Sequence, residues 1–323
     1  MMVRRKKRSE NQLGVMEVSN RGRLQGMLPA IAAPLPDNVS VSFEFFPPAN
    51  LGAEAQFLET LRKLEPLQPE FVSVTYGAGG TTQDRTLETV TKIRRTTRLE
   101  PAAHLTCVGA SRDDVDAVAR QFRDAGVNRI VALRGDAPKG MVRYEPHPDG
   151  YAYASDLVAG LKRVHDFRIA VAAYPEVHPE ALNADTDLDN LKRKVDAGAD
   201  LAISQYFFDT DVFLRFLERV RKAGIAIPII PGILPVTNFK QVSKFSKMCG
   251  TRVPNWMAEL FDGLDEEPEI RRMVAASIAA EQCRLLNANG ISQFHLYTLN
   301  HSALGYAICH MLGVKPQALA KAA

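Results

Sequence analysis

Short apolar runs alternate with amphipathic stretches along most of this chain, and this alternation limits the possible folds more than any other feature. Eight runs have the length of a β-strand, at residues 41–46, 71–76, 102–107, 129–134, 168–174, 201–208, 227–234 and 294–299. Most of them are apolar throughout, which is typical of parallel strands covered on both faces. Eight strands that each lead into a helix predict an α/β fold, a (β/α)8 TIM barrel.

The stretches between these runs carry apolar residues at helical spacing. They cover residues 54–64, 82–95, 111–125, 154–164, 186–197 and 210–223. Ser111 and Ser155 are suited to cap helices at their amino ends, and Gly126, Gly198 and Gly224 are suited to end them in a left-handed conformation. Residues 235–291 separate the last two runs and contain several helical patterns, so we expect extra helices between strands 7 and 8.

The chain divides into a tail and one large domain. Its 323 residues leave room for one barrel, which typically takes about 250 residues. We predict a basic, disordered tail at residues 1–38, a catalytic barrel at 39–315 and a short tail at 316–323. The basic run at residues 4–8 could instead be a tag for nucleic acid or an anionic surface, but nothing aromatic or amphipathic accompanies it.

Composition excludes several classes of protein. The formal net charge is only +3, so we expect no nucleic-acid partner, and no apolar stretch is long enough to span a membrane. A secretory signal is missing, and Glu10 and Glu17 disfavour a transit peptide, so we expect a cytoplasmic protein. The cysteines form no C-x-x-C pair, which disfavours zinc and disulfides and predicts buried thiols at positions 107, 249, 283 and 309.

Polar residues interrupt or follow the apolar runs at the carboxyl ends, where barrel enzymes place their active sites. They are Glu44, Thr75, His104, Thr106, Arg134, Gly135, Asp136, Tyr174, Glu176, His178, Gln205, Tyr297 and Asn300. Any one of them could be a satisfied structural residue, but their coincidence at one end of a barrel predicts an active site there. No histidine spacing suggests a metal site.

Glu44 is the sharpest single candidate. Its sequence neighbours are aromatic, so we expect desolvation to raise its pKa, as a general acid requires. The alternative is a structural ion pair with Arg or Lys.

Two further features lie after predicted strands. Arg134 and Asp136 could form a local ion pair or face a charged ligand. The loop at residues 77–82 could cradle phosphate with its backbone N–H groups, but it matches neither the dinucleotide-binding glycine motif nor the P-loop.

Several segments together closely resemble bacterial methylenetetrahydrofolate reductases. They are VSFEFFPP at 41–48, FVSVTYGAGG at 71–80, HLTC at 104–107, IVALRGD at 130–136, VAAYPEVHP at 171–179, LKRKVDAGA at 191–199, IPGILP at 230–235, FHLYTLN at 294–300 and YAICH at 306–310. Because these motifs follow one another in order, the resemblance covers about residues 41–313.

The resemblance implies a barrel that binds FAD. NADH or NADPH reduces the flavin and leaves, and methylenetetrahydrofolate then takes the hydride to give the methyl group used for methionine synthesis. Glu44 matches the general acid, whose proton opens the folate ring to an iminium. Asp136 matches a carboxylate near flavin and folate, where its charge favours the cationic intermediate.

The same resemblance assigns binding residues. The flavin site comprises Thr75, Tyr76, Ala78, His104, Arg134, Gly135, Asp136, Ala154, Tyr174, His178, Ala181, Asp187, Asn190, Arg193 and Lys194. Substrate contacts fall to Asp136, Gln205, Gln241, Phe245, Tyr297, Leu299 and His301, with Phe245 suited to stack on either substrate. The family commonly has Arg where this chain has His301. This difference affects the expected contact with the acidic tail of folate, and not the expected chemistry.

Two alternatives remain beside the reductase. A barrel glycoside hydrolase could pair Glu44 with Asp136 or Glu176. A flavin- or folate-binding partner protein without turnover is the non-enzyme alternative. The resemblance also implies a homo-oligomer, without fixing its stoichiometry or the choice between NADH and NADPH.

Overall fold

The computed structural model describes residues 38–76, 83–137, 140 and 144–318. Almost all of the predicted tail at 1–38 lies outside these residues, and so does the loop at 77–82 with the expected flavin contact Ala78. The domain boundaries therefore remain predictions.

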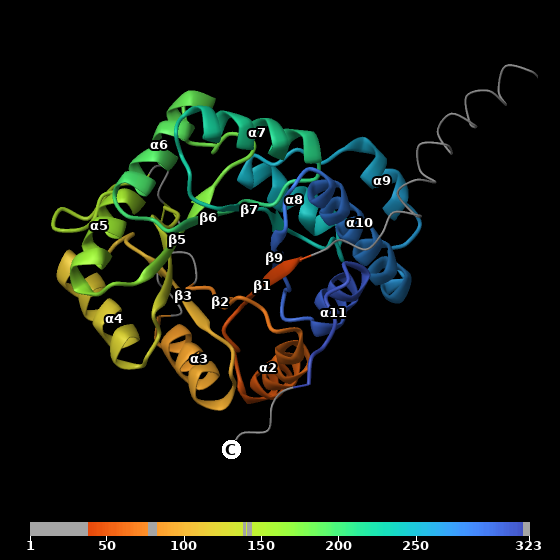
Figure 1. The fold of residues 1–323 in the computed structure, drawn as a ribbon, viewed down its shortest axis with the longest axis horizontal. Helices are drawn as coiled ribbons and strands as arrows, with labels where there is room; N and C mark the ends of the chain where they lie inside the picture. Colours follow the sequence, from red (N-terminus) through yellow and green to blue (C-terminus); the bar gives the residue numbers. More distant parts are fainter. Residues whose placement is uncertain (1–37, 77–82, 138–139, 141–143, 319–323) are drawn as a thin grey trace, which may run out of the picture. The chain divides into compact units, whose positions relative to one another are not determined.

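Within the described residues, nine parallel strands form one sheet in the order β7-β6-β5-β4-β3-β2-β1-β9-β8. Their bounds are β1 Ser40–Phe45, β2 Val72–Val74, β3 Pro101–Thr106, β4 Arg129–Leu133, β5 Arg168–Ala173, β6 Leu201–Ser204, β7 Ile229–Ile230, β8 Gly232–Ile233 and β9 Gln293–Tyr297. The strands enclose a ring with the helices outside it (Figure 1). The predicted (β/α)8 barrel is confirmed.

The seventh predicted run is split into two short strands. Pro231 alone separates β7, which pairs with β6, from β8, which pairs with β9. Proline has no backbone N–H to give to a ladder, so the chain changes partners there. The backbone oxygen of Pro231 still accepts a hydrogen bond from His295 N at 3.0 Å. The two edges of the sheet are thus one segment of chain, which closes the barrel.

Helices follow the strands along the chain, and six of them lie close to the predicted ranges. They are α2 Leu51–Leu64, α3 Gln83–Thr96, α4 Arg112–Asp124, α5 Ala154–Val164, α6 Ala184–Asp196, α7 Thr210–Lys222, α8 Phe239–Cys249, α9 Asn255–Phe261, α10 Pro268–Ala288 and α11 Ser302–Met311, with a 3-10 turn at Glu65–Leu67. The helices α8, α9 and α10 lie between β8 and β9 in the chain, where we expected an insertion. No helix among the described residues is long and apolar enough to cross a membrane.

The helix ends confirm most of the predicted caps. The Ser111 side chain accepts a hydrogen bond from Asp114 N, and the glycines at 126, 198 and 224 have φ angles of 76°, 113° and 77°. The predicted cap at Ser155 is wrong. Helix α5 begins at Ala154, the first residue of the predicted range, and its N-cap is Tyr153, two residues before Ser155. The Asp156 carboxylate accepts a hydrogen bond from Tyr153 N at 2.9 Å.

Side chains alternate between the two faces of each strand, so the barrel has an outer and an inner core. On β1, Phe43 and Phe45 belong to the core between strands and helices, and Phe45 meets Phe57 of α2 edge-on at 5.5 Å. The inner core is a smaller cluster of Phe71, Ala102, Val131, Ala170 and Ile203. Polar side chains that face inward near the carboxyl ends of the strands therefore stand on an apolar floor.

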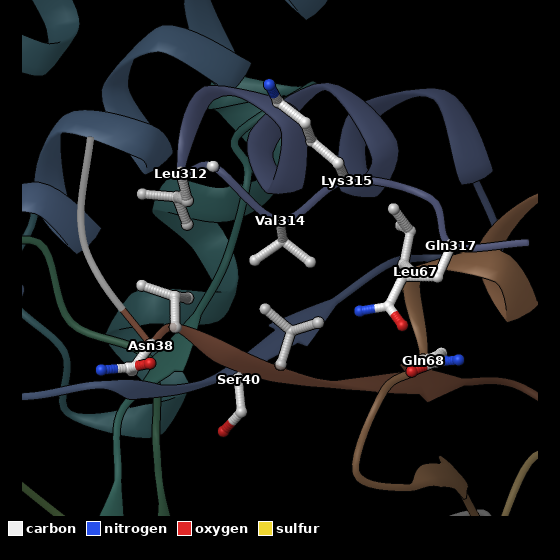
Figure 2. A pocket seen from close by; sticks show the side chains of 11 residues that line it. Asn38, Ser40, Leu67, Gln68, Leu312, Val314, Lys315 and Gln317 are labelled. Atoms are coloured by element: carbon white, nitrogen blue, oxygen red, sulfur yellow. The ribbon is translucent and has the colours of Figure 1, made fainter.

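A cavity of about 250 Å³ lies at the opposite end of the barrel, beside the start of β1. Val39, Val41, Leu67 and Val314 contribute its apolar lining. In Figure 2 the Val314 side chain points toward β1, whereas the Lys315 side chain runs the other way. Because Glu44 stands near the carboxyl end of the same strand, this cavity is separate from the expected active site.

Gly232 on β8 tests how tightly the barrel closes. A Cβ on Gly232 would lie 2.2 Å from the backbone oxygen of Ser204 and 2.7 Å from the Tyr297 hydroxyl. We expect Gly232→Ala to lower the free energy of unfolding by about 1–3 kcal/mol, because β6 or Tyr297 must move. Urea unfolding measures the effect.

Gly52→Ala on helix α2 is the matched control, since the nearest atom to its Cβ is Asn50 Oδ1 at 3.5 Å. This variant should be as stable as the wild type, or more stable by about 0.5–1 kcal/mol. Equal stability of Gly232→Ala and the wild type would contradict close packing where β8 joins the barrel.

Candidate active site

Glu44 lies inside the barrel, between two histidines. Its Oε2 is 3.4 Å from Nε2 of His104 on β3 and 3.6 Å from Nε2 of His295 on β9. Both imidazole rings are buried, whereas 19% of the Glu44 side chain is exposed. The centre of the site is therefore a carboxylate that reaches solvent from between two imidazoles.

The structure corrects our expectation that the pKa of Glu44 is raised. Desolvation does raise it, but hydrogen bonding and charge interaction with His104 and His295 outweigh burial and lower the pKa to about 2. The aromatic neighbours Phe43 and Phe45 lie on the other face of the strand and do not surround the carboxylate. The expected alternative, an ion pair of Glu44 with Arg or Lys, is not formed among the described residues either, since its ion-pair partners are the two histidines.

Ser42 and His295 complete this cluster, although neither is among the predicted site residues. The β1–β9 register pairs them, and Ser42 Oγ is 2.7 Å from Nδ1 of His295. The His295 ring stacks on Phe71 of the inner core, with centroids 5.6 Å apart. Residues two apart on a strand share a face. The expected inward position of Tyr297 therefore implies that His295 also faces inward.

Tyr297 and Gln205 lie on neighbouring sides of the barrel mouth. The Tyr297 hydroxyl donates to the backbone oxygen of Ser204 at 2.8 Å, which joins β9 to β6 across the split strand. Burial raises the pKa of Tyr297 well above its ordinary value, and the charge of Glu44 raises it further. Strand β6 ends at Ser204, four residues before its predicted end at Phe208, so Gln205 lies just after the strand. The Gln205 Oε1 accepts a hydrogen bond from Tyr206 N.

Arg134 pairs with Glu180 rather than with Asp136. Its Nη1 and Nη2 lie 2.5 and 3.1 Å from the two carboxylate oxygens, and its guanidinium lies 4.3 Å from the centre of the Tyr144 ring. Gly135 between them has φ 89°, and a Cβ there would come within 2.4 Å of Val108. This turn leaves the Asp136 side chain exposed and able to face a bound molecule.

The loop after β5 brings Tyr174 and His178 together. Their rings meet edge-on at 4.6 Å, and His178 Nδ1 accepts from Glu180 N at 3.1 Å. Asp187 on α6 accepts from His178 N at 3.1 Å. Burial raises the pKa of Tyr174, and the charges of Asp136 and Asp187 raise it further. The loops after β4 and β5 and the start of α6 therefore form one continuous wall.

Three predicted flavin contacts lie further along α6. Lys194 Nζ donates to the backbone oxygen of Ala172 at 2.5 Å, and burial lowers its pKa to about 8. Asn190 and Arg193 are exposed on the same helix. Lys194 is thus held against β5, while Arg193 reaches solvent.

Helix α8 carries Gln241 and Phe245, both exposed. The loop after this helix is tied to the loop after β5, because Glu176 Oε2 accepts from Arg252 N at 2.6 Å. Glu176 therefore connects the segment that carries Tyr174 and His178 to the helix expected to meet substrate.

The remaining predicted residues lie at element ends. Thr75 and Tyr76 follow β2, Ala154 begins α5, Ala181 precedes α6, and Leu299 and His301 follow β9.

Several buried polar atoms at this end of the barrel have no hydrogen-bond partner among the described residues. They are Ser73 Oγ, Thr106 Oγ1 and Glu176 Oε1. Buried polar atoms normally have partners, so this group indicates a polar ligand or bound water. In the described part of the chain no group of His, Cys, Asp and Glu is arranged to hold a metal ion. A carboxylate between imidazoles beside such atoms defines a barrel enzyme that acts on a polar small molecule.

Comparison with known proteins identifies the family. The sequence model described as methylenetetrahydrofolate reductase matches residues 31–313, and the chain belongs to this family. It is 51% identical to the 5,10-methylenetetrahydrofolate reductase of Pectobacterium carotovorum subsp. carotovorum over 284 residues, which are 88% of this chain and 93% of that protein. It is 52% identical to the Escherichia coli (strain K12) enzyme over 278 residues, 86% of this chain and 92% of that one.

A solved structure supports the fold alone. It is an uncharacterized protein from Clostridium thermocellum, described as binding two copies of 5-methyl-5,6,7,8-tetrahydrofolic acid. The TM-score is 0.55 at 11% identity, over 88% of this chain and 97% of that one.

Family membership settles the class of reaction. The chain is a methylenetetrahydrofolate reductase, an oxidoreductase of folate metabolism whose substrate is a small molecule. The glycoside hydrolase alternative is therefore set aside.

The lowered pKa of Glu44 predicts a specific loss of stability in acid. Its folded pKa of about 2 lies below the ordinary 4.5, so the ionised side chain stabilises the fold above pH 4.5 and this contribution is lost as the pH falls toward 2. The difference in unfolding free energy between the wild type and Glu44→Gln should therefore narrow, by up to about 3 kcal/mol, across that window.

Urea unfolding at pH values spanning the window measures this difference, with His104→Gln as a control that removes one cause of the shift. When both proteins also carry His104→Gln, the pH-dependent change in this free-energy difference should be smaller. A difference that stays constant with pH would contradict the lowered pKa.

Proposed function

We propose that this enzyme reduces 5,10-methylenetetrahydrofolate to 5-methyltetrahydrofolate with NADH or NADPH, through bound FAD, and so supplies methyl groups for methionine synthesis. The observation that carries the proposal is the cluster of Glu44, His104 and His295 at the carboxyl end of a barrel of this family. Such a cluster serves proton transfer to a small molecule.

The residues on the β3, β4 and β5 side of the mouth fit a flavin. They offer unpartnered buried donors and acceptors, the guanidinium of Arg134, and an exposed Arg193. We assign to FAD Thr75, Tyr76, Ala78, His104, Arg134, Gly135, Asp136, Ala154, Tyr174, His178, Ala181, Asp187, Asn190, Arg193 and Lys194. The flavin supplies a hydride acceptor for the nicotinamide and a hydride donor for the folate.

Glu44 with a pKa of about 2 is ionised near neutral pH, so it must take up a proton before it can act as the acid. The exposed part of its side chain can receive that proton from solvent, and His104 and His295, at 3.4 and 3.6 Å, hold the carboxylate in place. Glu44 then passes the proton to the folate nitrogen and returns to the carboxylate form. Asp136 places negative charge near the cationic form of the folate.

The substrate wall in this proposal runs from β6 through α8 to β9. It consists of Gln205, Gln241, Phe245, Tyr297, Leu299 and His301, with Asp136 opposite. Exposed Phe245 offers an aromatic face on which either a nicotinamide or a pterin can stack. Gln205 and Phe245 form the part of this wall that two substrates binding in turn would share. His301 can donate a hydrogen bond to the folate tail, but it lacks the bidentate geometry that Arg would offer a carboxylate.

We also propose a cytoplasmic homo-oligomer. The four cysteines are free thiols, as a reducing compartment permits, although Cys249 is only half-buried where we expected burial. Trp256 and Leu260 on α9 and Met273 on α10 are exposed apolar side chains of the kind that subunit contacts cover. Light scattering of the purified protein measures the assembly.

The test of the proposed function is the visible spectrum of the purified protein under anaerobic conditions. We expect a flavin band that NADH or NADPH bleaches and that methylenetetrahydrofolate restores. Parallel titrations with the two nicotinamides determine which one is preferred. A colourless protein that stays colourless when FAD is supplied would overturn the flavin mechanism, and a bleached band that folate does not restore would favour a binding protein without turnover.

Replacing Glu44 separates the two half-reactions. We expect Glu44→Gln to leave flavin reduction by nicotinamide largely intact and to lower the rate of folate reduction by about 100-fold or more, since only the folate needs the proton. Stopped-flow absorbance follows each half-reaction. Equal loss of both would argue against a role for Glu44 as the acid.

A further inference from the structure

Two consecutive residues after β9 adopt a left-handed backbone conformation without being glycine. Leu299 has φ 49° and Asn300 has φ 61°. This conformation is unfavourable for most residues other than glycine; asparagine adopts it more readily than most, whereas it is uncommon for leucine. Strain of this kind persists where the surroundings impose it, and it is found most often at functional sites.

The Asn300 side chain holds this turn against the end of β1. Its Oδ1 accepts a hydrogen bond from Phe46 N at 2.8 Å, and its Nδ2 donates to Phe46 O at 3.0 Å. One amide group thus satisfies both backbone groups of a residue that lies 254 positions away in sequence. The side chain extends the β1–β9 pairing beyond the last ladder pair, Glu44 with Tyr297.

The same turn fixes the backbone of the proposed acid. Thr298 donates to the backbone oxygen of Glu44 from its hydroxyl at 2.6 Å and from its N–H at 3.2 Å. The Thr298 hydroxyl oxygen also accepts from Asn300 N at 3.1 Å. Asn300, Thr298 and Glu44 are therefore joined in one set of hydrogen bonds.

We propose that Asn300 is a positioning residue for the folate half of the reaction. By holding Phe46 it keeps the Glu44 carboxylate in register with His104 and His295, and it presents Leu299, 36% exposed, and His301 to the mouth of the barrel. The proposal rests on the proposed function, because it takes Glu44 as the acid for the folate and Leu299 and His301 as folate contacts. Asn300 itself touches no reacting atom.

The test compares the two half-reactions in the FAD-loaded enzyme. In Asn300→Ala, folate reduction should fall about 10- to 100-fold, as expected for a small misplacement of reacting groups, while flavin reduction by nicotinamide stays within about twofold. The Kd for methyltetrahydrofolate, measured from the shift it causes in the oxidised flavin spectrum, should rise in the same variant.

A second variant separates the hydrogen bonds from the strain. Asn300→Gly also lacks the side chain but adopts positive φ without cost, so it should melt at a higher temperature than Asn300→Ala and still lose folate reduction. Asn289→Ala is the matched control, because Asn289, which follows the end of α10, is exposed and its side chain donates to Leu285 O at 2.8 Å. It should change neither half-reaction.

The outcomes are distinct. If both half-reactions slow down in proportion to the decrease in melting temperature, the role of Asn300 is purely structural and the positioning role is overturned. Recovery of folate reduction in Asn300→Gly would overturn it as well. A wild-type enzyme that lacks either half-reaction would instead overturn the proposed function.

Discussion

The pairing of β1 with β9 is the contact on which the site depends. It joins residues 253 positions apart, Ser42 with His295, and the same register sets Glu44 beside Tyr297. A contact of such sequence separation forms only when the whole barrel closes, so its entropy cost is met by the entire fold. The histidine on one strand and the carboxylate on the other become neighbours only through that closure. The acid–base cluster is therefore complete only in the closed barrel.

Closure also explains why a buried carboxylate is tolerated. Removing Glu44 from water is unfavourable, but His104 from β3 and His295 from β9 approach it from two sides. The Phe71 ring below supports the His295 imidazole, which restricts the directions in which that ring can move. The electrostatic character of the site thus follows from which strands neighbour β1, and not from residues adjacent to Glu44 in the chain.

That distinction separates what could be predicted from sequence from what could not. The apolar runs and the glycines that end helices are local features, so the barrel and most element bounds follow from them. The lowered pKa of Glu44 and the presence of His295 depend on strands far apart in the chain. The sequence suggested that aromatic neighbours surround Glu44, but side chains alternate along β1 and these neighbours lie on the other face. The β6 run continues past Ser204 as an apolar loop, and no pattern of hydrophobicity marks where its pairing stops.

The break at Pro231 has a further consequence for the barrel. Elsewhere each strand exchanges backbone hydrogen bonds with both neighbours, but across this break the connection is made by Ser204 Oγ accepting from Gly232 N and by Tyr297 donating to Ser204 O. Side-chain bonds can lengthen or exchange partners more readily than a continuous ladder. Closure of the ring therefore depends at this point on two hydroxyl groups, so replacing the side chain of Ser204 or Tyr297 would remove a connection that backbone groups make elsewhere in the barrel.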